Sequence, residues 1–275
     1  MWTVPLPACS ADAAYEACIS KVKNTELKKR LNDARSEISR VDASYRKAGL
    51  ARDFSGLRPE HCGLTGVSTE EMKRVYDGRM AAQGSPGRAI YDTIIVGTPN
   101  GICPLCGQGV VKTLDHYLPK SLYAALAVNP ANLIPACSDC NKAKSNAVED
   151  TLHPYYDNIE HEPWLRAEHK ETETASVRFF VDPPASWTPE FVGRVTRHFR
   201  VFGLNKLYIS NAAQHISGMQ LRLSLLAESG GAEAVRTYLA NEEESWRAVH
   251  LNSWQAALLN GLARSDWFCA GGFRL

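Results

Sequence analysis

Two Cys-x-x-Cys pairs constrain this chain more strongly than any other feature of its sequence. Cys103 and Cys106 form the first pair, and Cys137 and Cys140 form the second. Four thiolates in two short knuckles are the ligand set of a tetrahedral structural zinc site, because each knuckle aims two sulfur atoms at one ion. The sequence therefore predicts a Zn2+ ion that staples residues 103–140 into one folded segment.

The interval between the two pairs is longer than a minimal zinc ribbon needs, and it holds side chains that suit hydrolysis. Asp115 and His116 are adjacent, and Asn141 follows the last cysteine. An imidazole titrates near neutrality, so His116 can deprotonate a water molecule without large tuning of its pKa. Carboxylate and amide oxygens suit a hard, weakly held ion such as Mg2+, so Asp115 and Asn141 are candidate ligands.

Together these positions resemble an HNH endonuclease of the zinc-stapled ββα-metal type. The match is to the HNN variant, since Asn141 stands where the name-giving pattern has histidine. The resemblance implies that Asp115 and His116 end a first strand, and that Asn132 begins a second strand. A helix that opens at Cys140 would then complete the metal site. The resemblance also implies an enzyme that hydrolyses DNA phosphodiester bonds with one catalytic divalent ion and leaves a 5′ phosphate.

Each residue of this set has an expected role. His116 is the general base, and Asn132 positions the loop that carries it. Asp115 and Asn141 hold the catalytic ion. If the Asp-His pair lies on extended chain, its two side chains point to opposite faces, because successive side chains of a strand alternate. Phosphate contacts are expected from two lysines, Lys120 and Lys144.

Each of these roles also has a plain structural alternative. Asn141 could cap a helix, Asn132 could be a turn residue, and both lysines could be solvated surface side chains. His153, in Leu-His-Pro-Tyr-Tyr-Asp, could approach the site. A packed histidine in a turn is the preferred interpretation of that residue.

The charge balance predicts a weak electrostatic grip on nucleic acid. The net charge is only +1, although residues 110–146 are locally basic, with four lysines against two aspartates. A few phosphate contacts from this patch would make binding only modestly dependent on salt. Either the substrate is bound weakly and briefly, or another protein provides most of the affinity for nucleic acid.

The remaining cysteines and the apolar patterning favour a cytoplasmic protein. Cys9, Cys18, Cys62 and Cys269 show no paired spacing, and the N-terminus lacks the basic-then-apolar pattern of a signal peptide. The chain has no apolar run near the roughly 18 residues that a transmembrane helix needs. We therefore expect a reducing compartment and no membrane span.

Outside the cysteine segment, the patterns predict a mostly helical α+β protein. Ser10 caps a first helix, and a longer helix runs through an apolar seam at Leu27, Leu31, Ala34, Ile38, Val41 and Tyr45. This seam is expected to pack within the chain, with docking to a partner as the alternative. Ser68-Thr-Glu-Glu71 is a capping box that opens another helix, which ends near Gly84. A short helix follows around residues 89–96.

After the cysteine segment we expect a β-hairpin and then helices. Residues 176–182 form its strongest strand, and Pro189 starts a helix that stops at Gly203. Further helices extend to about Ala263, with a break at Gly230-Gly231. The predicted regions are a helical region at 1–98, the nuclease core at 99–158, and the hairpin with C-terminal helices at 159–275. We expect one compact unit that clasps the core between the two helical regions.

The biological setting and the substrate stay open at this level. The chain is also similar to HNH proteins of bacterial anti-phage systems of the Septu type. This similarity lies in the helical flanks, the opening Pro-Leu-Pro-Ala-Cys-Ser and the segment His-Pro-Tyr-Tyr-Asp that follows the nuclease core. That similarity implies antiviral defence and an ATPase subunit as partner. Two other classes are a zinc-braced nucleic-acid-binding or protein-binding module without cleavage, and a nuclease that acts on RNA or branched DNA.

Overall fold

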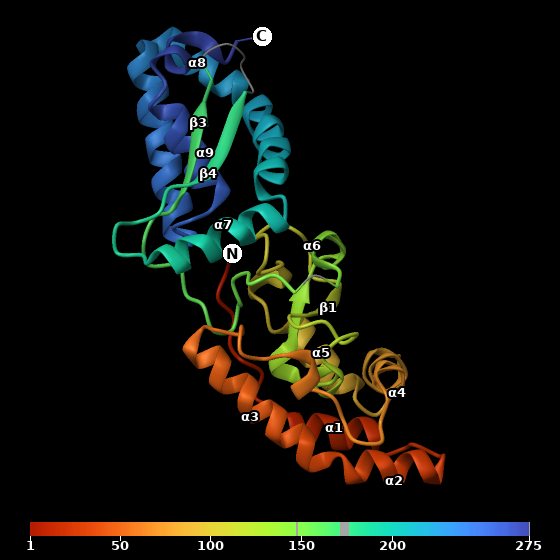
Figure 1. Cartoon of the computed structure of the whole chain (residues 1–275). Coiled ribbons are helices and arrows are strands. Elements are labelled where there is room, and N and C mark those ends of the chain that lie inside the picture. The colour runs from red at the N-terminus through yellow and green to blue at the C-terminus, as the bar shows by residue number, and fades with distance from the viewer. Residues whose placement is uncertain (147, 171–175, 275) are drawn as a thin grey trace. The chain divides into compact units, whose positions relative to one another are not determined.

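The computed structural model describes residues 1–146, 148–170 and 176–274. The chain forms two compact units, residues 1–158 and 159–275, in place of the single unit expected from the sequence. Buried apolar side chains occur in both units. The mostly helical α+β class is confirmed (Figure 1). The finer division of the first unit after residue 98 stays a prediction.

Short helices make up the first unit up to the first cysteine pair. They are α1 (Ala11–Ile19), α2 (Thr25–Asp33), α3 (Arg35–Ala51), η1 (Pro59–His61), α4 (Thr69–Val75), η2 (Tyr76–Ala81), α5 (Arg88–Val96) and η3 (Pro99–Gly101). Ser10 caps α1 as expected, since its Oγ accepts a hydrogen bond from the Ala13 N–H at 3.1 Å. The capping box of Ser68 and Glu71 is also present.

The long helix expected through Leu27 and Tyr45 is divided into α2 and α3 at Ala34. The Tyr15 hydroxyl donates a 2.9 Å hydrogen bond to the carbonyl of Leu31, which belongs to the last turn of α2. A carbonyl satisfied in this way does not need the next helical N–H, so the chain can change direction there. From Leu31 to Tyr45 the apolar seam is nevertheless buried, with both of these residues 0% exposed, whereas Leu27 is only half-buried.

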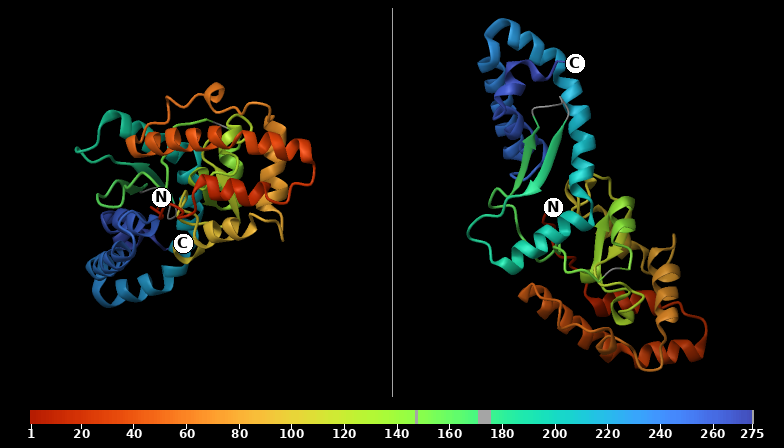
Figure 2. Two further views of the ribbon diagram at one scale, coloured as in Figure 1. Left: turned by 90° about the horizontal axis from the view of Figure 1, so that it is seen from below. Right: turned by 45° about the horizontal axis from the view of Figure 1, so that its top comes forward.

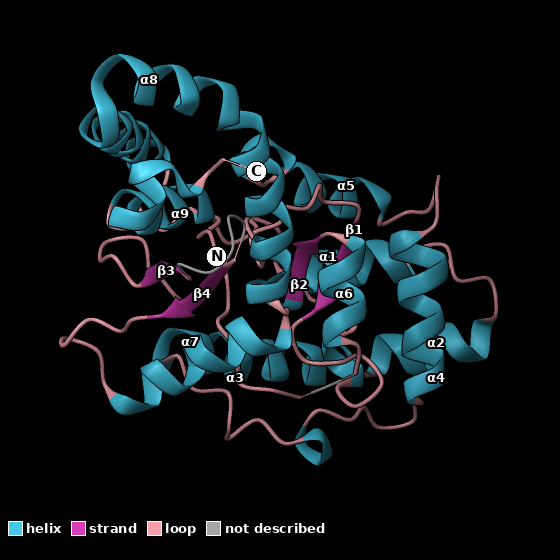
Figure 3. Cartoon of the chain, turned by 90° about the horizontal axis from the view of Figure 1, so that it is seen from above, coloured by secondary structure: helices cyan, strands magenta, loops and turns pink. Residues whose placement is uncertain are grey.

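The cysteine segment folds as two short antiparallel strands followed by a helix. Strand β1 (Thr113–His116) pairs with β2 (Leu133–Ala136), with Asp115 opposite Ile134 and His116 opposite Leu133. Helix α6 (Ser138–Lys144) packs beside β1, and α5 packs against both strands (Figures 1 and 3). The loop between the strands contains two single turns, η4 (Ala124–Leu126) and η5 (Pro130–Asn132).

The second unit is a β-hairpin covered by helices (Figure 2). The predicted hairpin is present as β3 (Leu165–His169) and β4 (Val177–Val181), and the helices are α7 (Pro189–Val201), α8 (Leu204–Val249), α9 (Trp254–Ala263) and η6 (Phe268–Gly272). The predicted break lies at Gly231, whose φ of 66° interrupts α8. A Cβ on Gly261 would lie 2.5 Å from the Ala167 carbonyl oxygen, so glycine allows α9 to approach β3 closely.

None of the helices in the described part of the chain combines the length and the apolar character of a membrane span.

Replacing Leu31 with Glu tests the packing of the seam. We expect a loss of roughly 3 kcal/mol or more in the free energy of unfolding, because a carboxylate would replace a fully buried side chain. Thermal and denaturant melts measure this loss. Leu50→Glu is the matched control, since Leu50 is 80% exposed and its replacement should leave stability unchanged. Equal melting of the two variants would contradict intramolecular packing of the seam.

Candidate active site and cysteine cluster

The four cysteines of the two pairs come together as one buried cluster. Their sulfur atoms all lie within 4.8 Å of one another, and all four cysteines are unpaired by disulfides. Cys106 Sγ and Cys137 Sγ are 3.9 Å apart. A disulfide would bring them to about 2.05 Å, whereas four sulfurs at about 2.3 Å from a tetrahedral zinc ion lie ~3.8 Å from each other. The cluster therefore fits a zinc ion.

Backbone groups shape both knuckles around the sulfur atoms. The N–H of Gly109 points to Cys106 Sγ at 3.3 Å, and the N–H of Cys140 points to Cys137 Sγ at 3.5 Å. Such contacts favour the thiolate, which is the form that binds metal. A Cβ on Gly109 would lie 2.6 Å from Cys137 Cβ, so only glycine lets the two knuckles meet this closely.

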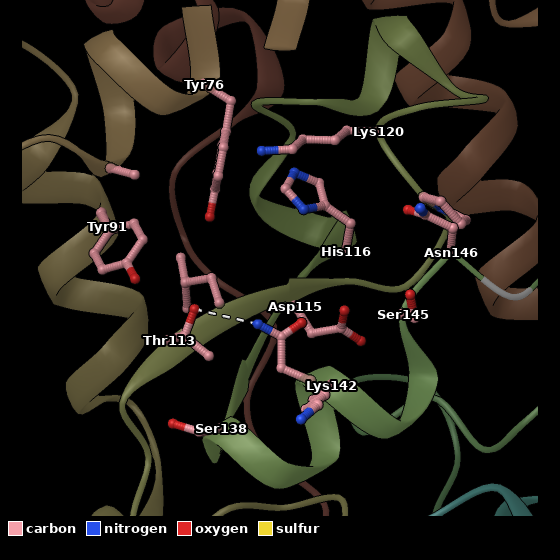
Figure 4. A pocket seen from close by; sticks show the side chains of 14 residues that line it. Tyr76, Tyr91, Thr113, Asp115, His116, Lys120, Ser138, Lys142, Ser145 and Asn146 are labelled. Atoms are coloured by element: carbon pink, nitrogen blue, oxygen red, sulfur yellow. Dashed lines mark hydrogen bonds between the residues drawn. The ribbon is translucent and has the colours of Figure 1, made fainter. Parts of the chain in front are cut away.

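A cavity of about 640 Å3 is lined by four of the predicted site residues, Asp115, His116, Lys120 and Asn141. Asn141 directly follows Cys140 of the cluster in the sequence. Asp115 and His116 occupy neighbouring positions of β1, and Figure 4 shows their side chains on different sides of its ribbon. Both still border the same cavity, as do the other two residues of the strand, Thr113 and Leu114. The expected alternation of faces therefore does not separate the two side chains.

The imidazole of His116 is held in one orientation by a backbone carbonyl. Its Nε2 lies 2.8 Å from the carbonyl oxygen of Ala127. A carbonyl only accepts hydrogen bonds, so Nε2 carries the proton and Nδ1 keeps its lone pair. Burial lowers the pKa of His116 to about 3, and the nearby lysine charges act in the same direction. The ring is therefore neutral and can accept a proton, but burial moves its pKa away from the near-neutral value expected from the sequence.

Asp115 is buried together with a lysine. Lys144 Nζ lies 3.4 Å from Asp115 Oδ2 and donates a 2.6 Å hydrogen bond to the backbone carbonyl of His116. Burial raises the pKa of Asp115 to about 6, while the lysine charge opposes this rise. Lys144 is only 2% exposed. Lys144 was expected to contact phosphate, but its ammonium group instead contacts the Asp115 carboxylate and the His116 carbonyl.

The two asparagines of the predicted set lie at different depths. Asn132 is fully buried, and its amide accepts from the Leu118 N–H at 2.8 Å and donates to the carbonyls of Leu118 and Leu126. It thus ties down the loop that follows His116. The amide nitrogen of Asn141 lies 3.5 Å from Thr113 Oγ1, the contact drawn in Figure 4, which leaves its oxygen available to a metal ion.

Of the two remaining candidates, Lys120 borders the cavity and His153 is packed in the interior. Lys120 borders the cavity, and its Nζ lies 2.5 Å from Asp77 Oδ1 and 4.2 Å from the centre of the Tyr76 ring. Its contact with phosphate stays a prediction. His153 is packed, as preferred above: it is 0% exposed, with Nε2 at 2.9 Å from the Tyr45 hydroxyl and Nδ1 accepting from the Tyr155 N–H at 3.2 Å.

One wall of the cavity was not foreseen from the sequence. It consists of Tyr76, the first residue of η2, and Tyr91, in α5. Both precede the cysteine segment, and both occupy apolar positions of predicted helices. Such positions normally indicate core packing, so no motif distinguishes them. Ser138, Ser145 and Asn146 also line the cavity.

Comparison with known proteins agrees with this geometry. Residues 103–147 match the HNH endonuclease family. They form an HNH endonuclease domain. Over 170 residues the chain is 29% identical to protein ea31 of Escherichia phage lambda, covering 58% of this chain and 57% of that protein. The chain thus spans little more than half the length of this relative. No solved structure gives a significant match.

Lys144→Met tests the buried ion pair of the HNH domain. We expect a loss of about 3–5 kcal/mol in the free energy of unfolding when no divalent ion is added, because Asp115 is left uncompensated in the interior. Mg2+ should recover part of this loss, since an ion that binds the folded state stabilises it. Lys142→Met, on the exposed side of the same helix, should unfold like the wild type. Identical denaturant curves for both variants would refute the pairing.

Proposed function

We propose that this protein is a metal-dependent endonuclease that hydrolyses phosphodiester bonds of DNA. The observation that carries the proposal is the meeting of Asp115, His116 and Asn141 in one cavity of an HNH domain. The same domain contains four clustered cysteines, for which we propose a structural zinc ion. The combination supplies a base, two oxygen ligands and a rigid support.

His116 acts as the general base in this proposal. The Ala127 carbonyl holds Nε2–H, so Nδ1 is the atom that accepts the proton of the attacking water. Lys144 and Asn132 hold the backbone at His116 and just after it, through the His116 carbonyl and the Leu118 N–H. A base fixed in this way loses little orientational freedom in the transition state.

Asp115 and Asn141 are the proposed ligands of the catalytic ion. Their side-chain oxygens are hard donors, which fit Mg2+ or a similar divalent ion, and both border the cavity. When bound, such an ion neutralises charge on the phosphate and on the leaving oxygen. Thr113 contributes by holding the Asn141 amide through its nitrogen.

Two biological settings are compatible with this chemistry. The first is the nuclease of a bacterial anti-phage system with an ATPase partner, and the net charge of +1 supports a partner that supplies much of the grip on DNA. The second is a nuclease carried by phages themselves, which the similarity to protein ea31 of phage lambda supports. Plaque counts on bacteria that carry the active chain or its His116→Ala variant distinguish them, because only a defence nuclease lowers the count.

The substrate is tested by incubating the purified protein with duplex, single-stranded and branched DNA and with RNA. Each reaction contains Mg2+, Mn2+ or Ni2+. Cleavage of RNA or branched DNA in preference to duplex would replace the proposed substrate. Binding without cleavage of any of them would favour the zinc-braced binding module.

His116→Ala should lower the cleavage rate on the order of a hundredfold or more, because the general base is lost. Added imidazole should restore part of the rate, since a diffusible base can enter the space that the ring occupied. Zinc content and circular dichroism verify folding. His61→Ala is the matched control, because His61 is exposed and lies outside the cavity. Wild-type cleavage by His116→Ala would overturn the mechanism.

The proposed division between two metals is tested by elemental analysis. Cys137→Ser should lose zinc and unfold the HNH domain, because a structural zinc contributes directly to folding. Asp115→Ala and Asn141→Ala should keep zinc and lose cleavage. Cys9→Ser is the control, since Cys9 lies outside the cluster. Active wild-type protein without zinc, or equal loss of zinc from all variants, would contradict this division.

A further inference from the structure

Tyr76 and Tyr91 form what we call the tyrosine wall of the cavity. Both side chains come from outside residues 103–147, the segment that matches the HNH family. They belong to the same compact unit as that segment. The cavity is therefore closed on one side by residues that the HNH domain itself does not contain.

Tyr76 is held against the proposed catalytic base. The Tyr76 ring meets the His116 ring edge to face, with 4.4 Å between the ring centres. Lys120 Nζ lies 4.2 Å from the centre of the Tyr76 ring. Only 6% of the residue is exposed. Tyr76 also begins a π-helical turn, a feature that occurs often at functional sites.

Tyr91, the other residue of the wall, is held by an arginine. The Arg88 guanidinium lies 4.5 Å from the centre of its ring and also donates a hydrogen bond to the Ala81 carbonyl at the end of η2. Arg88 thereby joins η2 to α5. A Cβ on Gly87 would lie 2.8 Å from the Arg79 carbonyl oxygen in η2, so a glycine permits the close turn between the two elements.

The hydroxyl groups of the wall are the part that faces the cavity. Figure 4 shows both hydroxyls pointing into the space between the rings and Thr113. Within residues 1–146, 148–170 and 176–274, neither hydroxyl makes a hydrogen bond. Two oriented donors without a partner, beside a base and two oxygen ligands, are suited to bind an anion with several acceptor oxygens.

We propose that Tyr76 and Tyr91 bind the reacting phosphate, each hydroxyl donating a hydrogen bond to one of its non-bridging oxygens. This inference rests on the proposed nuclease function. The phosphate would lie between the tyrosine wall and the Asp115–Asn141 side of the cavity, with His116 Nδ1 serving the attacking water. No covalent bond to either tyrosine forms. The hydroxyls hold the phosphodiester in place while the base acts.

The test compares Tyr76→Phe, Tyr91→Phe and the double variant with the wild type on two substrates. One is duplex DNA, and the other is bis(p-nitrophenyl) phosphate, a small diester that has no flanking nucleotides. Each single variant should lower kcat/KM roughly 10- to 100-fold, because one hydrogen bond to a charged oxygen is lost. The loss should be similar on both substrates, since the contact is to the reacting phosphate.

Tyr156→Phe is the matched control. The Tyr156 hydroxyl is buried without a partner among the described residues and does not border the cavity, so its removal should leave cleavage unchanged. A double Tyr76→Phe, Tyr91→Phe variant that cleaves at the wild-type rate would overturn the inference. So would a loss on duplex DNA alone, which would place the hydroxyls on flanking nucleotides. An inactive wild type on every substrate would instead refute the proposed function.

Discussion

The convergence of four cysteine sulfurs is the constraint on which the HNH domain depends. Strands β1 and β2 have four residues each, and a two-stranded hairpin of that size is marginally stable by itself. The first knuckle precedes β1 and the second begins α6, so the cluster joins both ends of the ββα segment. The catalytic candidates on β1 and α6 are thereby held at a fixed separation.

A second constraint follows from the burial of charge. Asp115 and Lys144 are both almost inaccessible, and an isolated charge at either position would be strongly unfavourable. Each compensates the other, and the lysine also binds the carbonyl of His116. The same interaction thus neutralises the carboxylate that we propose as a metal ligand and fixes the backbone of the proposed base.

The HNH domain does not build its cavity alone. The wall of Tyr76 and Tyr91 comes from helices that precede it, and Arg88 and Lys120 hold the two rings in place. The N-terminal helices therefore contribute side chains to the cavity in addition to supporting the HNH domain. The second compact unit, residues 159–275, packs around its own hairpin, and none of the site residues described above belongs to it.

The sequence by itself determined the local chemistry of the HNH domain. The spacing of the cysteines, the Asp115-His116 pair and the caps at Ser10 and Ser68 all act over a few residues, so they could be predicted without a fold. The break at Ala34, the burial of Lys144 and the tyrosine wall were decided only by the tertiary structure. Each depends on partners distant in the sequence, such as Tyr15 for α2, and local patterns do not encode the packing that brings such partners together.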